Sequence, residues 1–221
     1  MVEFLWSRPD GTASGTVVMA HGSGGPMDSP FMERMAGALA AEGLAVARFE
    51  FAYMAKRRQD GKKRFPSELD KLVAEMRNAV RLMAESGDCQ GPLILAGKSL
   101  GGRVAVTAAA EPLAPVAGIA CLGYPLHPTG EPEKLRLSPL LNCKLPLIIA
   151  QGTRDDFGNR AEFEALSLPK PLDIVWLEDG SHDFGPRGQS GATLKGNIAA
   201  AAAAVAAFAH RLAASEEGSA A

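Results

Sequence analysis

Residues 92–102 read PLILAGKSLGG, and the order of residue types in this stretch decides the fold. The apolar run PLILA predicts a buried strand, and the small residues from 103 to 110 predict a helix. Between them, Gly97-Lys98-Ser99-Leu100-Gly101 matches the pattern G-x-S-x-G. A serine on so tight a strand-to-helix turn has its hydroxyl pushed into the crevice at the carboxyl ends of the strands. Ser99 is therefore a candidate nucleophile, and an ordinary glycine-rich turn is the alternative.

Short apolar, β-branched runs alternate with helical patterns on both sides of this stretch. Such alternation is typical of a parallel sheet with helices on both faces. The sequence therefore predicts an α/β fold with a doubly wound, mostly parallel sheet of about six or seven strands and no large cap domain. The expected strands are residues 16–20, 44–51, 92–96, 116–122, 145–150 and 172–177, and the expected helices are 31–42, 66–86, 103–110 and 191–212.

Length and composition limit the classes of protein that remain. The 221 residues suit one domain, placed at residues 1–212, with a small, polar tail at 213–221 that we expect to be disordered. A net charge of −2 without a strong basic excess argues against nucleic acid as a partner. The longest apolar run, 198–209, is too short to cross a membrane, and we find no signal peptide. Oligomeric state is left open.

Cysteine usage indicates a reducing, cytoplasmic location. The chain has three cysteines, which are far apart in sequence and show neither paired metal-ligand spacing nor the even number of a disulfide framework. We therefore expect no metal site and no cofactor. The three are Cys89, Cys121 and Cys143.

A serine hydroxyl needs a base, and the base needs an orienting acid. His182 follows the last expected strand and Asp155 follows the strand before it, which gives the chain order nucleophile, acid, base. Asp155 is preferred over the adjacent Asp156, and an exposed turn histidine is the alternative for His182. Further acids near the histidine are Asp179 and Asp183, and the remaining histidines are His21, His127 and His210.

The glycine-rich loop at residues 21–25 (HGSGG), here called the oxyanion loop, follows the first expected strand. An oxyanion hole needs two preorganised backbone donors. We predict the amide of Leu100, directly after the nucleophile, and the amide of Ser23, with that of Gly24 as the alternative. An ordinary glycine-rich loop is the competing interpretation. Phosphate binding is disfavoured because neither glycine-rich segment has the required spacing.

Two features are candidates for substrate binding. Residues 56–64 (KRRQDGKKR) are basic, and Arg58 within them is a candidate ligand for a carboxylate or phosphate on the substrate. A solvated loop is the favoured alternative for this segment. Tyr124 and His127 are candidates for the wall of the substrate pocket, with structural packing equally favoured. Lys98, beside the nucleophile, is expected to be exposed.

The motifs together resemble those of the predicted α/β-hydrolases of the dienelactone-hydrolase-like type, a family that includes testis-expressed and non-specific-lethal-complex homologues of animals. The resemblance runs from about Thr16 to Phe208 and implies Ser99 as nucleophile, Asp155 as acid and His182 as base. Where the family resembles RDPFG, this chain has Asp156 in place of the proline. Dienelactone hydrolases proper use a cysteine nucleophile, so their lactone substrate is not implied. The motifs are AHGSGGPMDSPFM (20–32), KRRQDGKKR (56–64), AGKSLGGRVA (96–105), CLGYPLHPTGEPEKLR (121–136), QGTRDDFG (151–158) and DGSHDF (179–184).

These observations predict a serine hydrolase of the carboxylesterase or thioesterase type, which acts on a small soluble ester or thioester through an acyl-enzyme. No long insertion separates Ser99 from Asp155, so an open site without a large cap is expected. This disfavours a lipase with interfacial activation. The alternative from another class is a non-catalytic protein-interaction module on the same scaffold.

Overall fold

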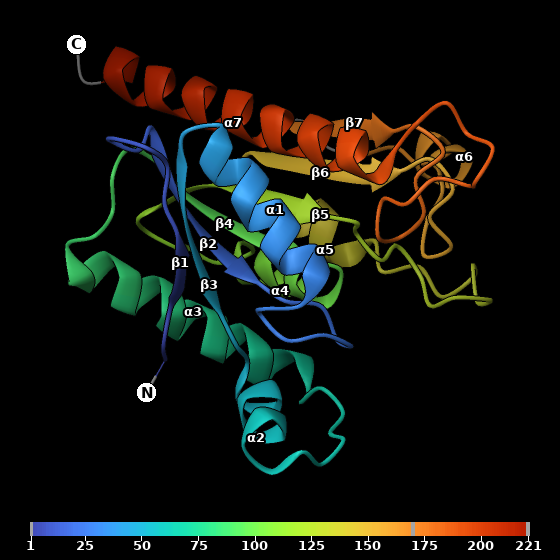
Figure 1. The fold of residues 1–221 in the computed structure, drawn as a ribbon, viewed down its shortest axis with the longest axis horizontal. Coiled ribbons are helices and arrows are strands. Elements are labelled where there is room, and N and C mark those ends of the chain that lie inside the picture. Colours follow the sequence, from blue (N-terminus) through green and yellow to red (C-terminus); the bar gives the residue numbers. More distant parts are fainter. Residues whose placement is uncertain (1, 169–170, 220–221) are drawn as a thin grey trace.

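The computed structural model describes residues 2–168 and 171–219 (Figure 1). Within these residues the strands form one seven-stranded sheet in the order β1-β3-β2-β4-β5-β6-β7. Strand β1 pairs antiparallel with β3, and the other pairs are parallel. The strands are β1 (Leu5–Ser7), β2 (Gly15–Ala20), β3 (Leu44–Phe49), β4 (Leu93–Lys98), β5 (Val116–Leu122), β6 (Leu147–Gly152) and β7 (Leu172–Leu177).

Helices cover both faces of this sheet, because successive side chains of a strand point to opposite faces. In β4, Leu93 and Leu95 enter the core beneath α3 and α4, whereas Ile94 and Ala96 enter the core beneath α1 and α7. The predicted α/β fold with a doubly wound, mostly parallel sheet of six or seven strands is thereby confirmed. The helices are α1 (Pro30–Ala41), α2 (Ala52–Asp60), α3 (Leu69–Ser86), α4 (Leu100–Ala108), α5 (Ser138–Asn142), α6 (Arg160–Glu164) and α7 (Leu194–Ser219).

Helix α7 is long and apolar enough, by length and composition, to cross a membrane. In this fold it instead packs on the sheet, with Val205, Phe208 and Ala209 buried in the same core as α1. A side chain at Gly118 of β5 would collide with the Phe208 ring, so this glycine allows the close contact. The helix continues to Ser219, past the expected end at residue 212, so residues 213–219 of the tail that was expected to be disordered are helical, and residues 220–221 lie outside the described residues.

The first half of the basic segment 56–64 belongs to helix α2, whereas residues 61–64 form the loop that was expected. Residues 52–60 are mostly good helix formers, and α2 ends at Gly61 in the left-handed conformation (φ 69°). The edge strand β1 and the one-turn helices α5 and α6 were also not expected. Each is only three to five residues long, too short to show a hydrophobic period.

Candidate active site

Ser99 occupies the sharp turn between β4 and α4, as its sequence context predicted. Its backbone lies at φ 52° and ψ −111°, a conformation that L-residues rarely adopt. The turn passes so close to β2 that a Cβ at Gly101 would lie 2.7 Å from the carbonyl oxygen of Ala20. Only glycine fits there, and the tight passage holds the Ser99 hydroxyl at the carboxyl ends of the strands.

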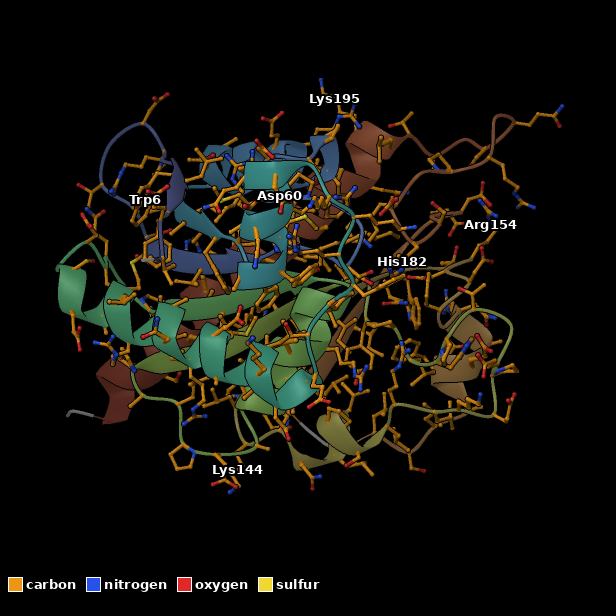
Figure 2. The ribbon with its side chains drawn as sticks, turned by 90° about the horizontal axis from the view of Figure 1, so that it is seen from below. Trp6, Asp60, Lys144, Arg154, His182 and Lys195 are labelled. Carbon is orange, nitrogen blue, oxygen red and sulfur yellow. The ribbon has the colours of Figure 1, made fainter. Side chains whose placement is uncertain are left out.

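A hydrogen-bonded chain joins Ser99, His182 and Asp155. The Ser99 Oγ lies 2.8 Å from His182 Nε2, and His182 Nδ1 lies 2.8 Å from Asp155 Oδ2. Because a carboxylate only accepts, Nδ1 carries the proton and Nε2 is free to accept from the serine hydroxyl. Figure 2 shows His182 among the loops at one end of the sheet. Ser99, Asp155 and His182 follow β4, β6 and β7, so three segments distant in sequence supply the three residues.

Asp155 is fully buried, and its position is fixed by two further donors. Its Oδ2 also accepts from Gln151 Nε2 (3.0 Å), and its Oδ1 accepts from the main-chain N–H of Phe157 (2.9 Å). The neighbouring Asp156 is exposed and makes no hydrogen bond or ion pair with the described residues. The geometry therefore favours Asp155 over Asp156 as the partner of His182.

Asp179, another acid near the histidine, is occupied elsewhere. It accepts from Arg154 Nε (2.6 Å) and from Arg187 Nε (2.9 Å) and main-chain N–H (2.8 Å). The bonds from Arg187, above all, lower the pKa of the Asp179 carboxyl. Its role is to hold together the loop that presents His182.

Two buried side chains fix the oxyanion loop. His21 Nε2 accepts from the main-chain N–H of Phe51 (3.2 Å), so the ring proton is on Nδ1, which donates to the carbonyl of Gly22 (2.6 Å). The Tyr53 hydroxyl lies 3.4 Å and 3.3 Å from the carbonyl oxygens of Gly22 and Ser23. In a trans peptide the N–H points opposite to the C=O, so these bonds turn the amides of Ser23 and Gly24 away from Tyr53.

The two amides predicted for the oxyanion hole border the same cleft as Ser99. The N–H of Leu100 is the first of α4 and therefore has no partner within its helix. Ser23 and Gly24 both line the cleft, so either main-chain amide is placed to be the second donor. Burial lowers the pKa of His21, which keeps its ring neutral and preserves the bonds to the loop.

Lys98, expected to be exposed, is buried with only 5% of its surface accessible. Its Nζ donates to the carbonyl oxygen of His182 (2.8 Å) and pairs with Asp183 Oδ1 (3.2 Å). Burial lowers the pKa of this ammonium, while the nearby carboxylates oppose that shift. The exposed-lysine prediction was wrong because the His182 loop folds over the side chain.

The three residues proposed for substrate binding are placed away from the cleft that contains Ser99. Tyr124 is fully buried, and its hydroxyl donates to the carbonyl of Arg136 (2.7 Å). His127 is 4% exposed, and its Nδ1 and Nε2 are hydrogen-bonded to the carbonyl oxygen of Pro128 (2.8 Å) and to Glu162 Oε1 (3.1 Å). These two side chains pack in the structure, so the alternative given for them is the better description.

Arg58 is occupied by two acids of its own surroundings. Its guanidinium bonds to both carboxylate oxygens of Asp28 (2.8 Å each) and to Glu50 (2.6 Å and 3.1 Å). The hydrogen bonds to Asp28 and Glu50 raise the pKa of Arg58, and the bond from Arg58 lowers the pKa of Asp28. With its donors used in this way, Arg58 has no free edge for a substrate anion, which corrects the expectation from sequence.

The cleft at Ser99 has a volume of about 630 Å³, which suits a small molecule. Its walls combine apolar side chains with arginines that the sequence analysis did not single out. Among the residues that the structure describes, no group of three or more His, Cys, Asp or Glu is arranged to hold a metal ion. The lining includes Phe31, Pro125, Phe157, Leu194, Ile198, Arg34, Arg103 and Arg136.

Sequence reasoning missed His21, Tyr53, Lys98 and Gln151 as supports of the site. The only available signal was position, since each lies within a few residues of the carboxyl end of a strand. Each of them also makes a contact that crosses 27 to 84 positions of sequence, and no local pattern reveals such a contact.

Comparison with known proteins agrees with this architecture. An alpha/beta hydrolase domain model matches residues 13–210. Similar structures include an alpha-beta serine hydrolase homologue from Coxiella burnetii (22% identity, 95% of this chain and 90% of that chain, TM-score 0.67). A dienelactone hydrolase from Anabaena variabilis is 25% identical over 96% of this chain and 90% of its own, with a TM-score of 0.66. A serine hydrolase without lid from Xanthomonas campestris shares 20% identity over 83% and 81%, with a TM-score of 0.60. The chain therefore belongs to the α/β-hydrolase domain family, as its sequence predicted.

Proposed function

We propose that the protein is a serine hydrolase of the carboxylesterase or thioesterase type, with Ser99, His182 and Asp155 as its catalytic residues. The observation that carries this proposal is the pair of 2.8 Å contacts from Ser99 Oγ to His182 Nε2 and from His182 Nδ1 to Asp155 Oδ2. Family membership and the open cleft at Ser99 support it. The resemblance to the testis-expressed and non-specific-lethal-complex homologues stays a prediction, as does the cytoplasmic location.

In the first half of the reaction, Ser99 Oγ attacks the carbonyl carbon of the ester while its proton passes to His182 Nε2. Asp155 keeps the other ring proton on Nδ1 and stabilises the imidazolium that forms. The oxyanion is stabilised by the amides of Leu100 and Ser23, with Gly24 as the alternative. When the tetrahedral intermediate collapses, His182 returns the proton to the leaving oxygen or sulfur, and an acyl-Ser99 ester remains.

In the second half, water takes the place of the leaving group. His182 Nε2 removes a proton from the water as its oxygen attacks the acyl carbonyl, and the proton then goes to Ser99 Oγ. The acid product leaves and the serine is regenerated. A cleft of about 630 Å³ agrees with a substrate of small-molecule size.

The first test is labelling of the purified protein with a fluorescent fluorophosphonate, alongside hydrolysis of 4-nitrophenyl acetate and butyrate. We expect labelling and turnover in the wild type and their loss in Ser99→Ala and His182→Ala. Circular dichroism of each variant shows that it is folded. A folded wild-type protein that neither labels nor turns over these esters would overturn the proposal and favour the non-catalytic interaction module.

A further inference from the structure

Two arginines from different parts of the chain line the cleft beside Ser99. Arg103 lies on α4 four residues after Ser99, so both are on the same side of the helix. Helical side chains tilt toward the helix N-terminus, which brings the Arg103 side chain back toward the serine. Arg136 comes from the loop after β5, and both residues line the cleft together with Ser99 and His182.

Neither arginine has a carboxylate in direct contact among the described residues; the charge of Glu131 acts on Arg136 from a longer distance, and Glu131 is paired with Lys134. Within the described part of the chain, no carboxylate lies within 4.0 Å of Arg103 or Arg136, although other lysines and arginines form eleven ion pairs. The Nε of Arg103 is buried and has no hydrogen-bond partner among these residues. Arg136 makes one long side-chain bond, from Nη1 to the carbonyl of Pro125 (3.4 Å). No hydrogen bond to the described residues uses the guanidinium donors of Arg103, and an unpartnered cation at the wall of a cleft favours an anionic ligand.

The two charges are close enough to influence each other. Burial lowers the pKa of Arg136, and the positive charge of Arg103 is the second cause. Arg136 is also held in place through its main chain, whose N–H donates to the carbonyl of Leu126 (2.6 Å) and whose carbonyl accepts from Tyr124 (2.7 Å). The buried Tyr124 therefore supports a second cation near the first instead of contacting a substrate itself.

The remaining charges of the cleft do not cancel this pair. Of the acids, only Asp183 lines the cleft among the described residues, and it is paired with Lys98. Arg34 adds a third guanidinium at the exposed side. A cationic cleft is thus present in a chain with a formal net charge of −2.

We propose that this cleft accepts esters that carry a carboxylate, held by Arg103 and Arg136, and this rests on the serine-hydrolase function proposed above. A planar carboxylate matches the donor geometry of a guanidinium and can accept from the terminal Nη groups of Arg103 and Arg136. The apolar side chains Phe31, Phe157 and Ile198 provide room for the rest of a small substrate. The substrate class is therefore an anionic ester with a short apolar body.

Two matched pairs of esters test this and identify which part of the substrate carries the charge. For the acyl part, 4-nitrophenyl hydrogen adipate is compared with its methyl ester. For the alcohol part, 4-acetoxybenzoate is compared with methyl 4-acetoxybenzoate. Each measurement is the ratio of kcat/KM for the anionic ester to that for its neutral partner, at low ionic strength because salt screens such contacts.

We expect one of the two ratios to fall by about tenfold or more in both Arg103→Gln and Arg136→Gln, since each removes a charge-assisted hydrogen bond. Arg81→Gln is the matched control: it removes an exposed arginine on α3 that lies outside the cleft, and its ratios should equal those of the wild type. Ratios that stay within about twofold of wild type in both cleft variants, while neutral esters are hydrolysed, would overturn the inference.

A binding measurement separates this inference from the catalytic proposal. The measurement uses Ser99→Ala, in which the arginine Nε–H NMR signals of Arg103 and Arg136 are assigned by their disappearance when Arg103→Gln or Arg136→Gln is added. Titration with monomethyl adipate and with benzoate should shift these two signals. If no ester is hydrolysed but these signals shift, the anion site stands and the catalytic proposal fails. If neither anion shifts them, the anion site is refuted whatever the hydrolysis assay shows.

Discussion

Replacing Lys98 with methionine should reduce catalysis far more than it reduces stability. The Lys98 ammonium donates to the carbonyl of His182 and pairs with Asp183 on the same loop. Without it, the loop that carries the base loses its anchor on the residue next to the nucleophile. A displacement of about 1 Å at a catalytic group can lower the rate by about 10²-fold, so we expect kcat/KM to fall by about 10- to 100-fold.

The effect on stability is a balance of two opposing contributions. Losing the bond to the His182 carbonyl costs about 1.5–3 kcal/mol, because its donor is charged. The substitution also removes the cost of burying an ammonium, which is several kcal/mol. The Asp183 side chain is 74% exposed, so its attraction offsets little of that cost and it is easily solvated after the change. The free energy of unfolding should therefore change by less than about 2 kcal/mol.

The assay combines urea denaturation with kcat/KM for 4-nitrophenyl acetate and the rate of fluorophosphonate labelling. Lys71→Met, which changes an exposed lysine on α3, is the matched control and should retain wild-type values. A folded Lys98→Met protein with kcat/KM within about twofold of wild type would refute the anchoring role. A loss of stability above about 4 kcal/mol would refute the energetic balance, because the buried ammonium would then be a net stabiliser.

Three further predictions follow from the contacts around the site. Asp155→Asn should lower kcat for ester hydrolysis by about 10⁴-fold, because His182 loses the correct imidazole tautomer. Asp156→Asn is the control: Asp156 is exposed and does not contact His182, so kcat in the same assay should change less than about threefold. Tyr53→Phe should cost about 1 kcal/mol in urea unfolding and lower kcat by about tenfold, because the oxyanion loop loses two long bonds; an unchanged kcat would contradict this support. Burial lowers the pKa of His21, so below pH 6.5 the unfolded chain binds a proton that the folded protein rejects. Stability should accordingly decline as the pH falls through that value, and His21→Gln should flatten this part of the curve, with an identical curve ruling the linkage out.

The sequence alone determined the fold class and the three residues of the hydrogen-bonded chain. Both depend on local patterns: apolar runs alternating with helical periods, and a G-x-S-x-G whose glycines must sit against neighbouring backbone. His182 and Asp155 were found because parallel strands end at one edge of the sheet, so residues that follow different strands meet there. The short elements β1, α5 and α6 were missed since three to five residues show no period.

Tertiary structure decided the charge of the cleft and the residues that support it. Arg58 was predicted to bind an anion because it lies in the most basic segment of the sequence. In the structure, Asp28, thirty positions earlier, neutralises the Arg58 guanidinium. Arg103 and Arg136 were not predicted as binding residues because neither lies in a basic cluster or in a motif that marks an anion site. Whether an arginine is free for a ligand depends on which carboxylates come within a few ångströms of it, and pairing at such range is set by packing rather than by neighbours in the chain.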